Sequence, residues 1–399
     1  MKYQLQVVLL ISSIGICLSC SSQQRATAVK DLNSTIDKNF KDADTQYKLM
    51  MQVLPAGQFP KTFERDTLRT SGPGWWCSGF YPGSLLYICE QTKDTVLYNE
   101  AKRTLRLLAK EQFNTTTHDL GFMMYCSFGN ALRLDSDEAY KQILINSARS
   151  LATRFNPTVG CIRSWDSKPS DFLVIIDNMM NLELLFWATK ATGDSSFYKI
   201  AVTHANTTMK NHFRPDYSSY HVLNYDPATG AVQQKRTAQG AADSSAWARG
   251  QSWGLYGYTV MYRETHDKKY LDQANHIAHF ILNNHHLPAD KIPYWDYDVP
   301  GIPDALRDAS AAAIMASAFI ELSGYANAKS AKEYMAAATT ILQTLSGESY
   351  KAVTGTNGGF ILQHSVGNMP QHSEVDVPLT YADYYFLEAM KRYKEATKK

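Results

Sequence analysis

The sequence predicts an all-α fold in a single domain, an (α/α)6 barrel in which six inner helices alternate with six outer helices. Three observations lead to this prediction. Segments with apolar residues at helical spacing recur along the chain, two kinds of them alternate, and few stretches show the pattern of a β-strand. The first kind is amphipathic with charge on one side, as in an outer helix. The second is apolar nearly all round, as in a helix that packs on both sides.

Both series can be placed along the chain. The predicted outer helices begin near residue 31 and then near Tyr98, Tyr140, Tyr198, Tyr270 and Tyr334. The predicted inner helices begin near Gly79, Gly121, Ile176, Ser244, Asp308 and Pro378. In such a barrel the loops that lead into the inner helices form one mouth, and loops on a rigid scaffold often carry function. We therefore expect the site among residues that precede or open the inner helices.

Residues 1–20 have the features of a secretory signal. Met1 and Lys2 give a positive start, and the apolar run over 7–18 is too short for a typical membrane span. The residues before Cys20 resemble a bacterial lipobox, which predicts lipidation of Cys20; a plain signal peptide is the alternative. The sequence thus predicts an exported bacterial protein, periplasmic or a membrane-anchored lipoprotein, with a short linker over 21–30 and the barrel over 31–399.

Composition narrows the function classes. A formal net charge of +2 at pH 7 argues against a nucleic-acid partner. Seven tryptophans and 24 tyrosines suit a sugar-binding cleft, although most aromatic residues of a large helical protein belong to its core. The cysteines after the signal have no metal-ligand spacing, so buried free thiols are expected, with no metal and no cofactor; these cysteines are Cys77, Cys89, Cys126 and Cys161.

Two aspartates are the first candidates for chemistry. Asp119 follows His118 just before the second predicted inner helix, and Asp177 opens the third after the uncharged run 172–176. A carboxylate among apolar residues is costly unless it is paired, hydrogen-bonded or used. Each could instead cap its helix. Because consecutive inner helices bring both to one rim, the pair is expected to raise one of the two pKa values, as a general acid requires.

A third cluster opens the fourth predicted inner helix. Arg249 and Trp253 are four residues apart and so share a helical face. The guanidinium could hold a carboxylate and the indole could be a sugar platform, or the pair could be a buried tryptophan beside a salt-bridged arginine. Gly250 between them would allow close approach of a backbone or a ligand. His221 and Gln239 lie in polar loops upstream, where His221 is either a donor to substrate or merely exposed.

Taken together, these blocks resemble glycoside hydrolase family 88, the unsaturated glucuronyl hydrolases. The resemblance runs in order over nearly the whole chain after the signal. The matching blocks are Gly74-Trp75-Trp76, 118–122, 177–181, 216–221, 247–253 and 378–388. The fold of that family is the (α/α)6 barrel, in agreement with the alternation of helices.

The resemblance implies hydration chemistry on lyase products, which carry a C4=C5 double bond on the non-reducing uronate. Asp177 would donate a proton to C4 and assist water attack at C5, after which the hemiketal opens and releases the partner sugar. Asp119 would be the second carboxylate, binding ring hydroxyls and tuning Asp177. The family's sugar-contact positions match His118, His221, Gln239, Arg249 and Trp253, with Trp76 and Trp165 as stacking candidates.

Three alternatives remain open at this point. One is an unsaturated rhamnogalacturonyl hydrolase on the same fold, the second is a lipid-anchored glycan-binding protein without turnover, and the third is an inverting glycosidase. The sequence does not show which glycosaminoglycan or other polysaccharide supplies the substrate, nor which sulfation or linkage is preferred. It also leaves the oligomeric state open. Lys235 and Arg236 either meet a sulfate or are solvated.

Overall fold

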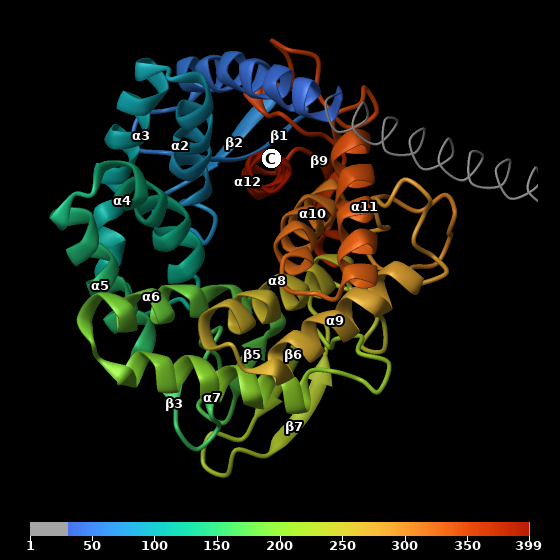
Figure 1. The fold of residues 1–399 in the computed structure, drawn as a ribbon. Helices are drawn as coiled ribbons and strands as arrows, with labels where there is room; N and C mark the ends of the chain where they lie inside the picture. The colour runs from blue at the N-terminus through green and yellow to red at the C-terminus, as the bar shows by residue number, and fades with distance from the viewer. Residues whose placement is uncertain (1–30, 399) are drawn as a thin grey trace, which may run out of the picture.

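The computed structural model describes residues 31–398, which form the predicted ring of helices (Figure 1). The outer helices are the helix over 31–53, α3 (Thr95–Leu108), α5 (Glu138–Ala152), α7 (Ser195–Asn211), α9 (Lys268–Asn283) and α11 (Ala328–Leu345). The inner helices are α2 (Phe80–Thr92), η2 with α4 (Gly121–Gly129, Asn130–Asp135), η3 with α6 (Ile176–Asn181, Leu182–Thr192), α8 (Ala248–Thr265), α10 (Ala309–Ser323) and α12 (Thr380–Thr397). The predicted signal with Cys20 and the linker lie outside the described residues.

The two series differ in burial as their sequences require. In outer helix α9 the buried residues recur along one face, for example Tyr270, Ala274 and Ile277. Inner helix α10 is buried on nearly every side, and its many alanines let neighbouring helices approach. Most outer helices begin with a side chain that accepts hydrogen bonds from the first free backbone N–H groups. These N-cap residues are Asp94, Asp137, Asp194, Asp267 and Asn327.

The ring closes where the two ends of the described chain meet. Inner helix α12 packs between α10 and α2. The Asn33 side chain donates to Thr397 Oγ1 at 3.2 Å, and the Tyr47 hydroxyl donates to the Asp383 carboxylate at 3.4 Å. The first outer helix and the last inner helix are therefore bonded directly to each other.

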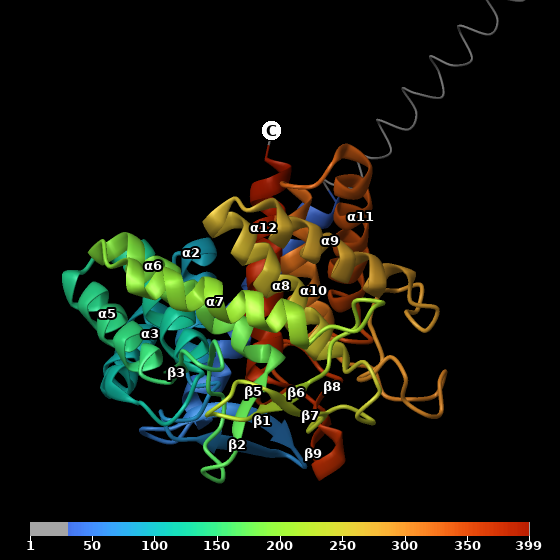
Figure 2. The same cartoon turned by 90° about the horizontal axis from the view of Figure 1, so that it is seen from below.

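Short strands were not predicted from the sequence. The described chain has four small antiparallel sheets, which gather at the end where the inner helices begin (Figure 2). They pair β1 (Phe59–Glu64) with β2 (Thr67–Ser71), β3 (Phe155–Asn156) with β4 (Cys161–Ile162), and β8 (Ser365–Asn368) with β9 (Ser373–Val377). The three-stranded sheet has the order β5 (Phe172–Ile175), β6 (Val222–Tyr225), β7 (Val232–Arg236). These strands build the mouth in which the site was expected.

Two predicted helix starts were wrong by four residues or more. The sixth outer helix begins at Ala328, six residues before Tyr334, because the Asn327 side chain caps it there. The fourth inner helix begins at Ala248 and not near Ser244, because Trp247 still has extended backbone angles, φ −61° and ψ 121°.

The four cysteines named above are free thiols as expected, three of them buried and Cys126 half-buried. None of the described helices is both long and apolar enough to cross a membrane. In the same residues, no group of three acidic, histidine or cysteine side chains is arranged to hold a metal ion.

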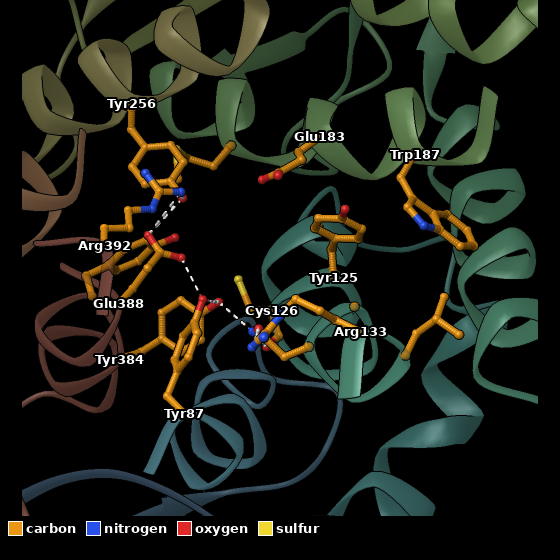
Figure 3. Close-up of a pocket in the computed structure, with 16 residues that line it drawn as sticks. Tyr87, Tyr125, Cys126, Arg133, Glu183, Trp187, Tyr256, Tyr384, Glu388 and Arg392 are labelled. Atoms are coloured by element: carbon orange, nitrogen blue, oxygen red, sulfur yellow. Dashed lines mark hydrogen bonds and ion pairs between the residues drawn. The ribbon is translucent and has the colours of Figure 1, made fainter. Parts of the chain in front are cut away.

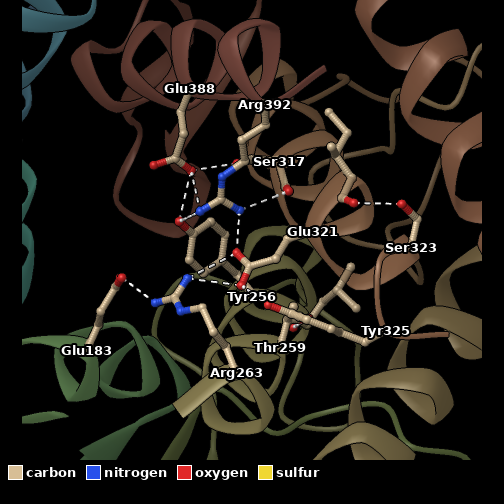
Figure 4. A network of polar contacts seen from close by, with 12 residues as sticks. Glu183, Tyr256, Thr259, Arg263, Ser317, Glu321, Ser323, Tyr325, Glu388 and Arg392 are labelled. Atoms are coloured by element: carbon tan, nitrogen blue, oxygen red, sulfur yellow. Dashed lines mark hydrogen bonds and ion pairs between the residues drawn. The ribbon is translucent and has the colours of Figure 1, made fainter. Parts of the chain in front are cut away.

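A charged cluster ties inner helices together toward their C-terminal ends (Figure 4). Arg263 of α8 donates to Glu321 of α10 at 3.0 Å, and Arg392 of α12 pairs with the same carboxylate at 2.7 Å. Glu388 of α12 accepts from the Tyr256 hydroxyl of α8 at 2.9 Å. Three consecutive inner helices are thereby cross-linked through paired charges that are half-buried, apart from the buried Glu388.

Next to this cluster is a cavity of about 370 Å³ between the inner helices (Figure 3). Its walls are rich in tyrosine and also carry Trp187, Glu183 and Glu388. Burial, together with the charges of neighbouring glutamates, raises the pKa of Glu183 despite the opposing charge of Arg263. Neither Asp119 nor Asp177 lines this cavity, so it is separate from the predicted carboxylate site.

Candidate active site

Asp177 is placed by the junction of a strand and a helix. Strand β5 ends at Ile175, which pairs with Val222 of β6, and the Ile176 N–H donates to the His221 carbonyl at 3.1 Å. This pairing brings the His221 side chain to Asp177, with 3.7 Å between Nε2 and Oδ2. Asp177 is only 9% exposed, and its Oδ2 has no hydrogen-bond partner among the described residues.

The surroundings of Asp177 favour its protonated form. Burial is the largest cause, and together with the charge of Asp119 it raises the pKa from 3.8 to about 7. The Arg249 charge, the backbone N–H at the helix start and the Trp253 indole act in the opposite direction. Burial outweighs them, so the carboxyl keeps a proton close to neutral pH, as a general acid must.

Asp119 is held by its own loop. The Thr117 hydroxyl donates to Oδ2 at 2.8 Å, and His118 Nε2 lies 3.2 Å from Oδ1. His118 is buried, which lowers its pKa although the Asp119 charge acts to raise it. Neither Asp119 nor Asp177 is the N-cap of its helix, since Leu120 and Ile175 occupy those positions. The helix-cap interpretation is therefore wrong for both aspartates.

Gly121 lets the second and third inner helices meet. A Cβ at this position would lie 2.5 Å from Cα of Asn181, which only glycine avoids. The Asn181 side-chain oxygen accepts from the Phe122 N–H at 3.2 Å. The helix that follows Asp119 is thus locked against the turn that carries Asp177.

His221 is fixed in one tautomer by the backbone. Its Nδ1 accepts from the N–H groups of Ala238 at 3.1 Å and Gln239 at 3.2 Å. Burial lowers its pKa well below the ordinary value, and nearby arginines add to that effect. The single proton of the neutral ring is therefore on Nε2, the nitrogen that faces Asp177. The imidazole packs 4.4 Å from the Trp247 ring.

Arg249 is engaged by protein acceptors. Nη1 donates to Asp308 Oδ2 at 3.2 Å and to the carbonyl of Val366 at 2.5 Å, and Nη2 donates to the carbonyl of Gly367 at 2.6 Å. The guanidinium also lies over the Trp247 ring at 4.5 Å. Of the two interpretations left open by the sequence, the structure shows the salt-bridged arginine. Arg249 contributes a fixed positive charge and anchors β8 at the mouth.

Trp253 is fully buried and packs between Phe122 at 5.0 Å and Tyr385 at 5.3 Å between ring centroids. Its ring is not presented as an open sugar platform, because these two rings enclose it. Its indole Nε1 has no hydrogen-bond partner in the described part of the chain. The space at Gly250 is filled by the Trp247 ring, since a Cβ there would lie 2.8 Å from it.

The remaining predicted residues adjoin the same site. Gln239 donates through Nε2 to the Gly367 carbonyl at 3.3 Å. Trp165 is half-buried with its ring centroid 6.3 Å from that of His221. Trp76 is also half-buried and packs 4.9 Å from Tyr381. His221 thus contacts Trp165, Asp177 and the Gln239 backbone, while Trp76 and Trp253 both pack on Phe122 of the Asp119 block.

The sequence did not identify Trp247, Asp308 or the 366–367 backbone as parts of this site. Trp247 lies within a block that had been singled out, and Asp308 had been noted only as a helix start. Lys235 donates to the Asn211 carbonyl at 2.7 Å, so its ammonium is directed to the protein rather than left free for a sulfate. Arg236 is near enough to His221 to help lower its pKa.

Comparisons with known proteins agree with this geometry. The family model described as Glycosyl Hydrolase Family 88 matches residues 48–390. An unsaturated glucuronyl hydrolase of Formosa agariphila is 45% identical over 98% of both chains. An unsaturated chondroitin disaccharide hydrolase of Streptococcus pneumoniae is 31% identical over 91% of this chain and 92% of the relative.

Solved structures give the same result. An unsaturated glucuronyl hydrolase described as specific for heparin superposes with a TM-score of 0.88 and 50% identity, covering 91% of this chain and 98% of that one. An unsaturated glucuronyl hydrolase of Streptococcus agalactiae has a TM-score of 0.85 and 28% identity, covering 90% and 92% of the two chains. A variant of the latter enzyme was solved in complex with dGlcA-GalNAc6S.

Proposed function

The chain belongs to glycoside hydrolase family 88, and from that membership we infer that it is an unsaturated glucuronyl hydrolase. The reaction removes the 4,5-unsaturated uronate from the non-reducing end of an oligosaccharide by hydration of the C4=C5 double bond. The family assignment leaves no support for the glycan-binding protein without turnover, which would have no use for a protonated carboxyl. It also favours the glucuronyl over the rhamnogalacturonyl substrate.

The observation that carries the mechanism is the buried carboxyl of Asp177, whose Oδ2 has no hydrogen-bond partner among the described residues and whose burial raises the pKa to about 7. In the proposed reaction Asp177 gives its proton to C4, and positive charge develops at C5 and the ring oxygen. The carboxylate left behind stabilises that charge and then takes a proton from the water that attacks C5. The resulting hemiketal opens and releases the partner sugar.

The neighbours of Asp177 have supporting roles in this proposal. His221 presents an N–H from Nε2 to a hydroxyl or carboxylate oxygen of the uronate. Asp119, already oriented by Thr117 and His118, accepts hydrogen bonds from ring hydroxyls. Its negative charge also helps Asp177 to keep its proton before the reaction.

For the natural substrate we propose heparin-type fragments before chondroitin-type ones. The support is the degree of identity, 50% with the structure described as specific for heparin against 28% with that of the Streptococcus agalactiae enzyme. The test is a panel of lyase-generated unsaturated disaccharides that differ in backbone and sulfation. Loss of the ultraviolet absorbance of the double bond reports turnover, and no loss on any member of the panel would refute the proposed function.

We also propose that the chain is exported and lipidated at Cys20, as its first twenty residues suggest. The protein would then act in the periplasm or on a membrane surface, on fragments released by lyases. Intact-mass analysis of the mature protein tests this. A diacylglycerol-sized increment on a chain that starts at Cys20 is expected, and it should be absent from Cys20→Ser. An unmodified N-terminus after cleavage would indicate a plain signal peptide.

A further inference from the structure

Trp75 is an aromatic side chain at the catalytic mouth that remains open to solvent. It is 46% exposed, whereas the next residue, Trp76, is half-buried against Phe122 and Tyr381. Both belong to the segment that leads into inner helix α2, and the Trp75 N–H donates to the Gly72 carbonyl at 3.2 Å. One tryptophan therefore packs into the site, and the ring beside it lies further out.

Lys61 fixes one face of the Trp75 ring. Its Nζ lies 4.7 Å from the ring centroid and 3.3 Å from Oε1 of Glu374 on β9. Lys61 is the extra residue of a bulge in β1, since the pairing with β2 shifts register between Pro60 and Thr62. A bulge re-aims the side chain of its extra residue. Lys61 of β1, held by Glu374 of β9, therefore covers one face of the indole, while nearly half of the Trp75 surface stays exposed to solvent.

This arrangement adjoins the catalytic carboxylates. The buried thiol of Cys77, two residues after Trp75, has its pKa raised first by burial and also by the charges of Glu374 and Asp119, while Lys61 acts to lower it. The charges of Glu374, Asp119 and Lys61 thus all act on the short segment that carries Trp75. Trp75 is connected to the site through Trp76 on one side and through Lys61 and Glu374 on the other.

We propose that Trp75 is the stacking platform of an outer subsite, which binds a sugar ring of the substrate beyond the first disaccharide on the reducing side. The inference rests on the proposed function. The flat indole can pack against the C–H face of a pyranose ring. Because Lys61 already holds the indole in place, binding a sugar costs less conformational entropy. Because Trp76 packs on Phe122, three residues after Asp119, the exposed ring one residue before it is placed to meet a later sugar. Because Glu374 neutralises the charge of Lys61, this subsite is expected to bind the apolar face of a sugar ring and to have no preference for a sulfate group.

The test compares unsaturated disaccharides with unsaturated tetrasaccharides made by the same lyase. Trp75→Ala should raise KM for the tetrasaccharide about three- to tenfold, which corresponds to the loss of one aromatic stacking contact. Its kcat should be unchanged, and its kcat/KM on the disaccharide should stay within twofold of the wild-type value. Trp75→Phe should restore most of the tetrasaccharide affinity, and sulfated and unsulfated tetrasaccharides should respond alike.

A matched control removes another exposed ring far from the mouth. Tyr198 on outer helix α7 is 37% exposed, and Tyr198→Ala should leave both substrates unaffected. An unchanged KM of Trp75→Ala for the tetrasaccharide would overturn the proposal. So would an equal loss on both substrates, because the ring would then act on the first disaccharide or on the fold. Wild-type turnover of the disaccharide tests the proposed function separately.

Discussion

Replacing Asp177 by asparagine should strongly lower activity and make the protein more stable as the pH rises above 4. Loss of a general acid lowers rates by about 10²- to 10⁴-fold. The gain in stability follows from the raised pKa. In the unfolded chain this carboxyl loses its proton above about pH 4, whereas in the folded protein it keeps the proton to about pH 7.

The size and sign of the stability change can be worked out by linkage. Between these two values the folded state holds one more proton than the unfolded state, so the free energy of unfolding of the wild type falls as pH rises. Each pH unit lowers it by about 1.4 kcal/mol, and about three units give about 4 kcal/mol. The stability contribution of the protonated carboxyl is complete below pH 4 and is lost as pH passes 7. Asparagine has no proton to lose, so Asp177→Asn escapes this decrease.

Urea unfolding followed by tryptophan fluorescence between pH 4 and pH 9 measures the effect. The difference in unfolding free energy between Asp177→Asn and the wild type should be small at pH 4, grow to pH 7 and then level off. Asp272→Asn is the control, because Asp272 is an exposed carboxylate on outer helix α9. Its stability profile should follow that of the wild type. Parallel profiles for Asp177→Asn and the wild type would refute the reasoning, and so would near-normal turnover by Asp177→Asn.

Other substitutions test the supports of the site. Asp119→Asn removes a charge that raises the pKa of Asp177, so the alkaline limb of the residual kcat/KM profile should move to lower pH; an unmoved limb would contradict the coupling. Gly121→Ala forces a Cβ against the neighbouring helix start, and urea unfolding should show a loss of about 1–3 kcal/mol together with lower activity. Wild-type stability would mean that the two helices can separate without cost. Arg249→Met leaves the Asp308 carboxylate buried without its ion pair, with an expected loss of about 3–5 kcal/mol that Arg249→Lys recovers only in part. Equal stability of the Met and Lys variants would show that this ion pair contributes little.

The ring of helices was predictable because its signals are local. Apolar spacing, the charged side of each outer helix and the polar turns can all be read within about fifteen residues. The short strands were missed for the opposite reason. Strand β5 reads as an uncharged run of four residues, and its partner β6 lies some fifty residues later. Its role is defined only by that pairing, which is also what brings His221 to Asp177.

The candidate site divides in the same way. Asp177 could be identified because a lone carboxylate in an apolar run stands out in the sequence. The environment of Arg249 could not, since its acceptors Asp308 and Val366 are 59 and 117 residues away along the chain. The proton position on His221 depends on two backbone N–H groups that are 17 and 18 residues distant. Such long-range acceptors leave no local pattern, so the sequence suggested the residues but not which of them are already occupied.

The direct bond between the first outer helix and the last inner helix has a consequence for how the chain must fold. A ring closed by its own ends cannot be completed in the order of synthesis. Inner helix α2 is made early, yet one of its two inner neighbours, α12, is made after all the other described helices. Until α12 has emerged from the ribosome, an apolar face of α2 stays uncovered, and chains that lack α12 are expected to aggregate. Trimming the chain from the α12 end would therefore remove the closure of the whole barrel rather than a dispensable tail.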